Sequence, residues 1–163
     1  MKTEHKLKTL RQARVIVSQL KKKGKKVVFT NGCFDLLHLG HITYLQAAKK
    51  KGDVLVLGLN SDASVKKIKG ATRPILPEFD RAGILSALSC VDFIVLFKEA
   101  TPLRLIKNLK PNILVKGADW KTDNIVGSDI VKSSGGKVQT ITYLKNRSSS
   151  KIIKDIIRKH GKK

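Results

Sequence analysis

The chain has 163 residues, 41% of them hydrophobic, which predicts a single domain over residues 1–163 with room for a core and a pocket. Its formal net charge of +22 favours anionic partners. No apolar run is long enough to cross a membrane, no hydrophobic signal segment opens the chain and two cysteines make no disulfide framework, so we expect a cytoplasmic protein.

The hydrophobic pattern alternates between helical and strand spacing along the chain. A leading helix is expected over residues 4–22, where apolar residues recur every three or four positions. Strands are then expected near 27–31, 54–59, 92–97, 112–116 and 137–141, and helices near 40–51, 79–88, 102–109, 126–134 and 149–159. This order predicts an α/β fold, a doubly wound, Rossmann-like parallel sheet with helices on both faces and ligands at the carboxyl ends of its strands. The glycine patterns of a dehydrogenase and of a P-loop kinase are absent.

The first strand leads into a turn with the features of an anion site. Residues 27–30 are apolar and rich in β-branched side chains, Asn31 and Gly32 end the strand, and helical spacing begins at about Leu39. A strand, a tight turn and a helix start leave backbone N–H groups unsatisfied, with the positive end of the helix dipole behind them. We therefore expect an anion to bind there.

Two histidines stand in this turn. His38 and His41 are three positions apart, so both imidazoles can face one ligand, and Gly40 between them adds no side-chain bulk. A lone histidine at a helix start is more often a cap or a partly buried polar residue. Zinc would need a third ligand, but His5 and His160 lie at the chain ends, so no metal site is predicted from the residues.

Cationic and hydroxyl side chains follow three later elements. Residues 64–74 are interpreted as a flexible loop with four cations beyond the second strand, although an ordinary solvated loop fits the composition as well. Residues 116–120 follow a strand, either as a nucleotide contact or as a turn capped by Asp119. Residues 148–150 are three serines that open the last helix, where N-capping and phosphate binding suit the same hydroxyls.

The segment from Gly32 to His41 resembles the signature of the nucleotidyltransferases that carry a His-x-Gly-His motif. The similarity extends over about residues 10–158 and is greatest to the adenylyltransferases that act on D-glycero-β-D-manno-heptose 1-phosphate. The further matching segments are residues 60–62, Lys66, Lys69, residues 73–75, 80–81, 114–120 and 148–150. Ala118 and Trp120 occupy positions where that family commonly has Gly and Tyr, and residues 148–150 are Ser-Ser-Ser where it commonly has Ser-Thr-Thr.

The resemblance implies a role for each matching residue. Catalysis is assigned to His38, His41 and Lys69. Nucleotide binding is assigned to Thr30, Asn31, Gly32, Cys33, Phe34, Gly40, Lys116, Gly117, Asp119, Arg147, Ser148, Ser149 and Ser150. Substrate or phosphate contacts are assigned to Asp35, Lys66, Arg73 and Arg81. Asp35 is expected to orient the turn rather than to bind metal, and Arg81 could equally be an ion-paired surface residue.

The implied reaction transfers AMP from ATP to the heptose 1-phosphate and gives ADP-heptose, for lipopolysaccharide core synthesis, and pyrophosphate. Mg²⁺ is expected with the ATP, a separate sugar kinase is expected to supply the acceptor, and a homodimer is typical of the family. A cytidylyltransferase, or another nucleotidyltransferase acting on another phosphorylated alcohol, remains an alternative.

A basic nucleic-acid-binding module is the alternative of a different class. Lysine-rich tracts at residues 21–26, 49–51 and 158–163 could neutralise nucleic-acid phosphates. They lie at expected helix ends and at the C-terminus, where lysines complement the helix dipole. Aromatic residues make up only 5% of the chain and do not interleave with these tracts, so an enzyme is favoured.

Overall fold

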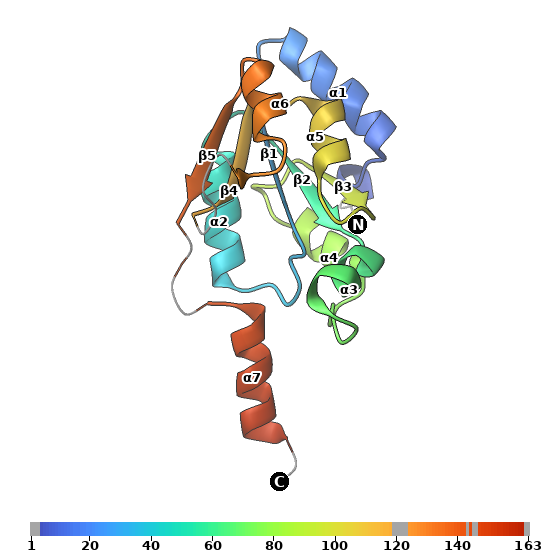
Figure 1. The fold of residues 1–163 in the computed structure, drawn as a ribbon, viewed down its shortest axis with the longest axis vertical. Coiled ribbons are helices and arrows are strands. Elements are labelled where there is room, and N and C mark those ends of the chain that lie inside the picture. Colours follow the sequence, from blue (N-terminus) through green and yellow to red (C-terminus); the bar gives the residue numbers. More distant parts are fainter. Residues whose placement is uncertain (1–3, 119–123, 143, 145–146, 162–163) are drawn as a thin grey trace.

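The computed structural model describes residues 4–118, 124–142, 144 and 147–161, and its centre is a five-stranded sheet in the order β3-β2-β1-β4-β5 (Figure 1). All four strand pairings are parallel. The strands are β1 (Val27–Gly32), β2 (Val54–Asn60), β3 (Phe93–Phe97), β4 (Ile113–Gly117) and β5 (Lys137–Ile141). The expected doubly wound α/β fold is confirmed.

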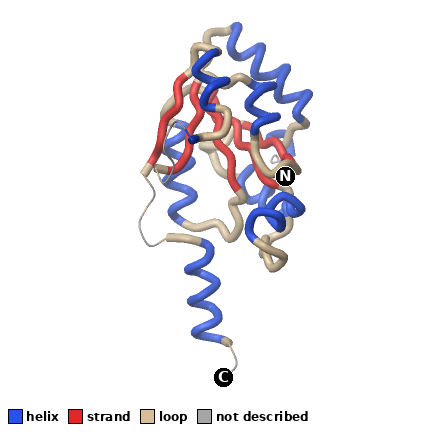
Figure 2. The backbone as a smooth tube through the Cα atoms, in the orientation of Figure 1, coloured by secondary structure: helices blue, strands red, loops and turns tan. Residues whose placement is uncertain are grey.

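Helices cover both faces of the sheet (Figure 2). They are α1 (Leu10–Lys22), α2 (Leu39–Lys49), α3 (Asp62–Lys69), α4 (Glu78–Ser86), α5 (Leu103–Leu109), α6 (Ser128–Ser133) and α7 (Ser149–His160). Side chains of α2 and α4 pack with one core cluster, and those of α1, α5 and α6 pack with another. Neighbouring β1 residues Val28 and Phe29 are fully buried in different clusters, because successive strand side chains point to opposite faces.

The leading helix is shorter than the sequence pattern predicted. Residues Glu4–Lys6 form a 3-10 turn, Leu7 makes a parallel bridge to Ile94, and α1 begins only at Leu10. Thr9 forms a capping box with Gln12, which fixes this start. The prediction of a helix from residue 4 is wrong because the backbone before Thr9 pairs with β3, the edge strand of the sheet, instead.

The interpretation of residues 64–74 as a loop is also wrong over its first half. Asp62–Lys69 forms α3, which is capped by the Ser61 hydroxyl and followed by Gly70 at φ +96°. The lysines of this segment therefore stand on a helix. Among the described residues, no helix is both long and apolar enough for a membrane span.

Candidate active site

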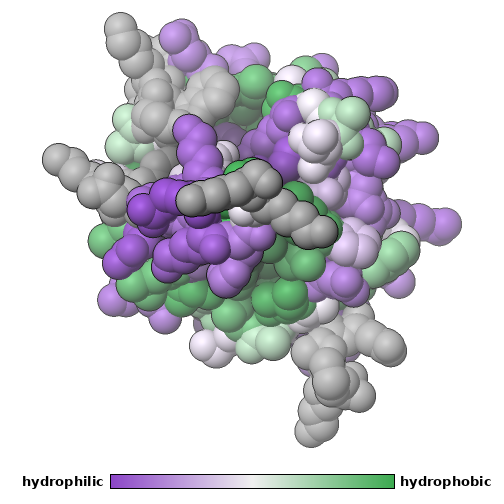
Figure 3. Space-filling view, turned by 90° about the horizontal axis from the view of Figure 1, so that it is seen from below, coloured by the Kyte–Doolittle hydropathy of each residue, from purple (hydrophilic) through white to green (hydrophobic). Residues whose placement is uncertain are grey.

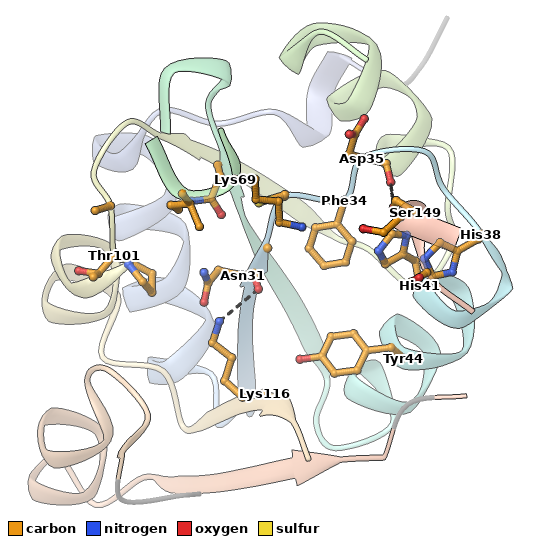
Figure 4. A pocket seen from close by; sticks show the side chains of 18 of the residues that line it. Asn31, Phe34, Asp35, His38, His41, Tyr44, Lys69, Thr101, Lys116 and Ser149 are labelled. Carbon is orange, nitrogen blue, oxygen red and sulfur yellow. Dashed lines mark hydrogen bonds between the residues drawn. The ribbon is translucent and has the colours of Figure 1, made fainter. Parts of the chain in front are cut away.

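The described residues enclose a cavity of about 660 Å³ near the carboxyl ends of β1, β2 and β4 (Figure 4). In this view Asp35, His38, His41 and Ser149 gather on one side of the cavity, and Asn31, Lys69, Thr101 and Lys116 lie on the other. The position agrees with the expectation for a doubly wound sheet. The lining residues are Asn31, Gly32, Cys33, Phe34, Asp35, His38, His41, Tyr44, Asn60, Ile68, Lys69, Ala100, Thr101, Pro102, Lys116, Ile125, Val126, Arg147, Ser148, Ser149 and Ser150.

The two histidines form a stacked pair at the start of α2. Their ring centroids are 3.8 Å apart at an interplanar angle of 22°, and the ring of Phe34 lies 5.2 Å from that of His41. His38 occupies the N-cap position, but its side chain makes no capping hydrogen bond, and the Nδ1 atoms of both histidines are buried without a partner. The structure therefore does not support the simple cap interpretation for His38.

Burial keeps this histidine pair neutral. The pKa of His41 is lowered to about 4, mainly by burial and then by the electrostatic effects of His38 and Lys69, which outweigh the opposing effect of Asp35. Burial, and then the charge of Arg147, also lowers the pKa of His38. Near neutral pH each ring is therefore an uncharged imidazole with one N–H donor.

Gly40 allows the rings and α7 to approach each other. A Cβ at this position would lie 3.0 Å from the His38 ring and 3.2 Å from the Cβ of Arg147. A larger residue at position 40 would force the His38 ring or Arg147, just before α7, to move. The packing therefore requires the small residue that was predicted to leave space here.

Asp35 holds the turn between β1 and α2. Its carboxylate, 2% exposed, accepts hydrogen bonds from the backbone N–H groups of Ile75 and Leu76 and pairs with Arg73 at 2.8 Å. Burial alone would raise the pKa of Asp35, but these hydrogen bonds and the Arg73 charge outweigh it and hold the pKa below its usual value. Phe34 and Leu36 on either side have φ of 45° and 39°, a costly conformation for these residues. The anchored carboxylate is what keeps the turn in this shape.

Arg81 is ion-paired, as the alternative interpretation expected, but it is buried rather than on the surface, and it is not among the residues that line the cavity. Its guanidinium is 1% exposed and pairs with Asp62 at 2.7 Å. It also donates to the backbone carbonyls of Cys33, Asn60 and Leu76. Arg81 thereby joins the ends of β1 and β2 to the starts of α3 and α4. A sequence gives no signal for such a residue, because its partners are 5 to 48 positions away.

The serines at the start of α7 meet the histidine turn. Ser148 is the N-cap, and its hydroxyl accepts from the N–H of Lys151 at 3.1 Å. The Ser149 hydroxyl donates to the carbonyl of Asp35 at 2.6 Å. Ser150 and Arg147 also line the cavity. The predicted combination of a helix cap and a cavity wall in one segment is thus present.

Of the remaining predicted site residues, some line the cavity and others do not. Lys69 lines the cavity from the last turn of α3, whereas Lys66 is exposed and Arg73 is paired with Asp35, and neither lines it. Lys116 lines it and donates to the Asn31 carbonyl at 3.4 Å. Asp119 lies outside the described residues.

Two of the predicted nucleotide contacts lie beneath or beside the cavity. Thr30 is fully buried below it and shares a 2.7 Å hydrogen bond with Tyr44, and Gly117 is the last residue of β4. Sequence reasoning missed several residues of the wall. These are Tyr44, Asn60, Ile68, Ala100, Thr101, Pro102, Ile125 and Val126.

The first strand of the parallel sheet leads through a glycine turn into a His-x-Gly-His helix start. A serine-rich helix start lies beside the histidines and a lysine lies on the other side of the cavity, which is the arrangement of a nucleotidyltransferase. The Cytidylyltransferase-like family matches residues 29–155. The chain belongs to this family of nucleotidyltransferases.

Two individual relatives show which members of the family the chain resembles in sequence. The chain is 54% identical over 159 residues to the bifunctional protein HldE of Geobacter metallireducens, covering 98% of this chain and 32% of that one. It is 52% identical over 151 residues to the bifunctional protein HldE of a Nitratiruptor species, covering 93% of this chain and 32% of that one. The chain therefore spans about a third of the length of the curated relatives it matches.

Two solved structures share the fold. The lipopolysaccharide core biosynthesis protein of Thermoplasma volcanium matches with a TM-score of 0.61 at 34% identity, over 76% of this chain and all of that one. A pantoate–β-alanine ligase of Francisella tularensis matches with a TM-score of 0.59 at 19% identity, over 93% of this chain and 78% of that one. The second likeness concerns the fold alone.

Proposed function

We propose that the protein transfers AMP from ATP to D-glycero-β-D-manno-heptose 1-phosphate and releases pyrophosphate and ADP-heptose, in the cytoplasm. The observation that carries the proposal is the stacked, neutral histidine pair, which has the serine-rich start of α7 beside it and Lys69 on the other side of one cavity. The similarity to the HldE proteins and to a lipopolysaccharide core biosynthesis protein supports the choice of acceptor.

The proposed reaction is a direct displacement at phosphorus. An oxygen of the acceptor phosphate attacks the α-phosphorus of ATP, the bond to the pyrophosphate oxygen breaks in line, and the electron pair leaves with pyrophosphate. No general base is required, because a sugar 1-phosphate is already an anion at neutral pH. Catalysis then depends on alignment and on stabilising the negative charge that gathers on the transferred phosphate.

The side chains around the cavity suit these tasks. His38 and His41 would donate hydrogen bonds to the oxygens of the α-phosphate and the leaving group. Lys69, on the side of the cavity away from the histidines, would contribute a positive charge to the phosphates. The serine hydroxyls and N–H groups at the start of α7 would hold the outer phosphates, as helix starts do.

Mg²⁺ is proposed to arrive on the nucleotide. In the part of the chain that the structure describes, no group of three His, Cys, Asp or Glu side chains could hold a metal ion, and the Asp35 carboxylate is taken up by Arg73 and two backbone N–H groups. Mg²⁺ is commonly bound by substrate phosphates and water molecules, and it would neutralise part of the phosphate charge.

A cytidylyltransferase is the second candidate, favoured by the name of the matching family. The described lining of the cavity includes Thr101, Ile125 and Val126, and this mixture of polar and apolar groups does not by itself specify a base.

We propose that the sugar 1-phosphate is made by a sugar kinase activity that is distinct from this nucleotidyl-transfer site.

The decisive experiment is a pyrophosphate-release assay that crosses ATP, CTP and GTP with phosphorylated sugars and alcohols. We expect the fastest release with ATP and the heptose 1-phosphate, and release that is slower by roughly 10²–10³-fold from the His41→Asn variant. A preference for CTP would replace the adenylyltransferase with the second candidate. If no pair is turned over while the protein binds duplex DNA tightly and with steep salt dependence, the nucleic-acid-binding alternative is correct.

A further inference from the structure

The last helix has an apolar face that the rest of the described chain does not cover. α7 has twelve residues and none of them is buried. It extends away from the sheet and its helices (Figure 1). Ile156 is 51% exposed and Ile157 is 63% exposed, although isoleucine is among the residues most often buried in proteins. Within the part of the chain that the structure describes, the side-chain hydrogen bond that ties α7 to the body of the protein runs from Ser149 to the Asp35 carbonyl.

The side chains of α7 divide into two faces. Residues 152, 153, 156 and 157 are isoleucines that recur at helical spacing and form one line, called here the isoleucine stripe. Lys151, Lys154 and Arg158 lie on the other face, where Asp155 pairs with Lys151 at 3.5 Å and with Arg158 at 3.3 Å. The view along α7 shows green apolar and purple polar side chains in separate areas (Figure 3).

Such a helix requires a partner. An isolated helix of about 12 residues is only marginally stable in water, and most helical stability in proteins comes from packing of an apolar face. The stripe continues toward the cavity, because Ile152 lines a groove together with Leu39, which is 57% exposed at the start of α2.

Charge decides which partner fits. Four residues of α7 are lysine or arginine and one is acidic, and the whole chain carries a formal net charge of +22. A second copy of the chain would bring like charges together along the edges of the stripe. A surface with both an apolar interior and a negative outer layer instead complements the isoleucines and the flanking cations at once.

We propose that α7 lies on an anionic lipid surface, with the isoleucine stripe in the interface and its lysines and arginine at the headgroups. Binding of this kind is peripheral, because α7 is far too short to span a bilayer. Since the first turn of α7 also lines the catalytic cavity, lipid binding would hold the serine-rich wall of the site in place.

The test is flotation of the full chain with vesicles of phosphatidylglycerol and phosphatidylcholine, compared with pure phosphatidylcholine, at low and high salt. We expect at least a tenfold greater partition onto the anionic vesicles, reduced by salt. The double variant Ile156→Ser, Ile157→Ser should lose at least tenfold of this binding. The matched control is Ile75→Ser, Phe79→Ser, which removes two comparably exposed apolar side chains before and at the start of α4 and should bind as the unchanged protein does.

Nucleotidyl transfer in the absence of vesicles separates this proposal from the proposed function, because Ile156 and Ile157 do not line the cavity and both variants should keep their turnover. Equal partition of the unchanged protein onto both kinds of vesicle, or onto neither, would overturn the proposal. So would anionic binding that survives in the α7 variant. Sedimentation that shows dimers of the unchanged protein and monomers of the α7 variant would assign the stripe to a second copy instead.

Discussion

The two walls of the catalytic cavity are held in very different ways. The turn between β1 and α2 is fixed by buried charges: Arg81 donates to the Cys33 carbonyl, and Asp35 is bound by Arg73 and by two backbone N–H groups. The start of α7 is joined to that turn by one hydrogen bond, from Ser149 to Asp35. The histidines are therefore preorganised by their surroundings, whereas the serines belong to a helix without buried residues, which we expect to adjust more easily.

This difference suits the proposed division of labour. Stabilising a developing charge requires donors that do not have to reorganise during the reaction. Gripping and releasing the outer phosphates instead requires a wall whose position can change with the ligand. The variants that follow test the rigid wall first and the adjustable wall last.

The largest effect should come from Arg81. Arg81→Met leaves Asp62 and three backbone carbonyls without their donor, so the free energy of unfolding should fall by about 3–5 kcal/mol. Chemical denaturation measures this. The control is Arg104→Met, which breaks the exposed 3.1 Å pair with Glu99 and should cost less than about 1 kcal/mol. Equal losses in the two variants would show that Arg81 does not secure the rigid wall.

Replacing either histidine should abolish most activity without unfolding the protein. His38→Asn and His41→Asn should each lower kcat by roughly 10²–10³-fold, the effect of removing one preorganised donor to a developing charge. Steady-state kinetics together with thermal unfolding check both parts. His5→Asn, at an exposed position near the N-terminus, should leave kcat unchanged. A folded His41 variant with normal turnover would remove that residue from the mechanism.

Stability should depend on pH through His41. Its pKa is about 4 in the folded protein and ordinarily about 6.5, so the unfolded chain binds a proton more readily than the folded one between these values. Its contribution is fully present above pH 6.5 and is lost as the pH falls toward 4, a decrease of roughly 2–3 kcal/mol in the free energy of unfolding. Urea titrations at stepped pH measure the slope.

The His41→Asn variant should flatten that slope in the same window. Asp35 acts at lower pH, because its pKa is depressed and its contribution disappears only below the ordinary value of 3.8. An unchanged slope in the variant would mean that His41 is not buried and neutral as described.

The smallest effects should separate the two serines of α7. Ser149→Ala removes the hydroxyl that donates to the Asp35 carbonyl and is proposed to turn to a phosphate when ATP binds, so the stabilisation given by saturating ATP should fall by about 1.5–3 kcal/mol. Ser148→Ala removes the helix cap and should cost about 1 kcal/mol in unliganded stability. If Ser149→Ala keeps its full ATP stabilisation and KM, the serines are only a helix start.

Much of the sheet and half of the site could be predicted from the sequence because their signals are local. Strand and helix spacing identified all five strands, and the His-x-Gly-His segment identified the turn, the paired rings and the space left by Gly40. The serine cap of α7 follows from residue type and position. The helical pattern was misleading before α1, where Glu4–Lys6 form a 3-10 turn and Leu7 bridges to Ile94 of β3.

The sequence by itself determined the α/β class, the histidine turn and the serine helix start, because periodicity, glycine and capping chemistry act over a few residues. Only the tertiary structure decided that Arg81 is buried, that Arg73 is occupied by Asp35 and that Ile156 and Ile157 of the isoleucine stripe are exposed. Burial and ion pairing depend on segments tens of residues apart that meet only after folding, and a charged residue has the same letter in either environment.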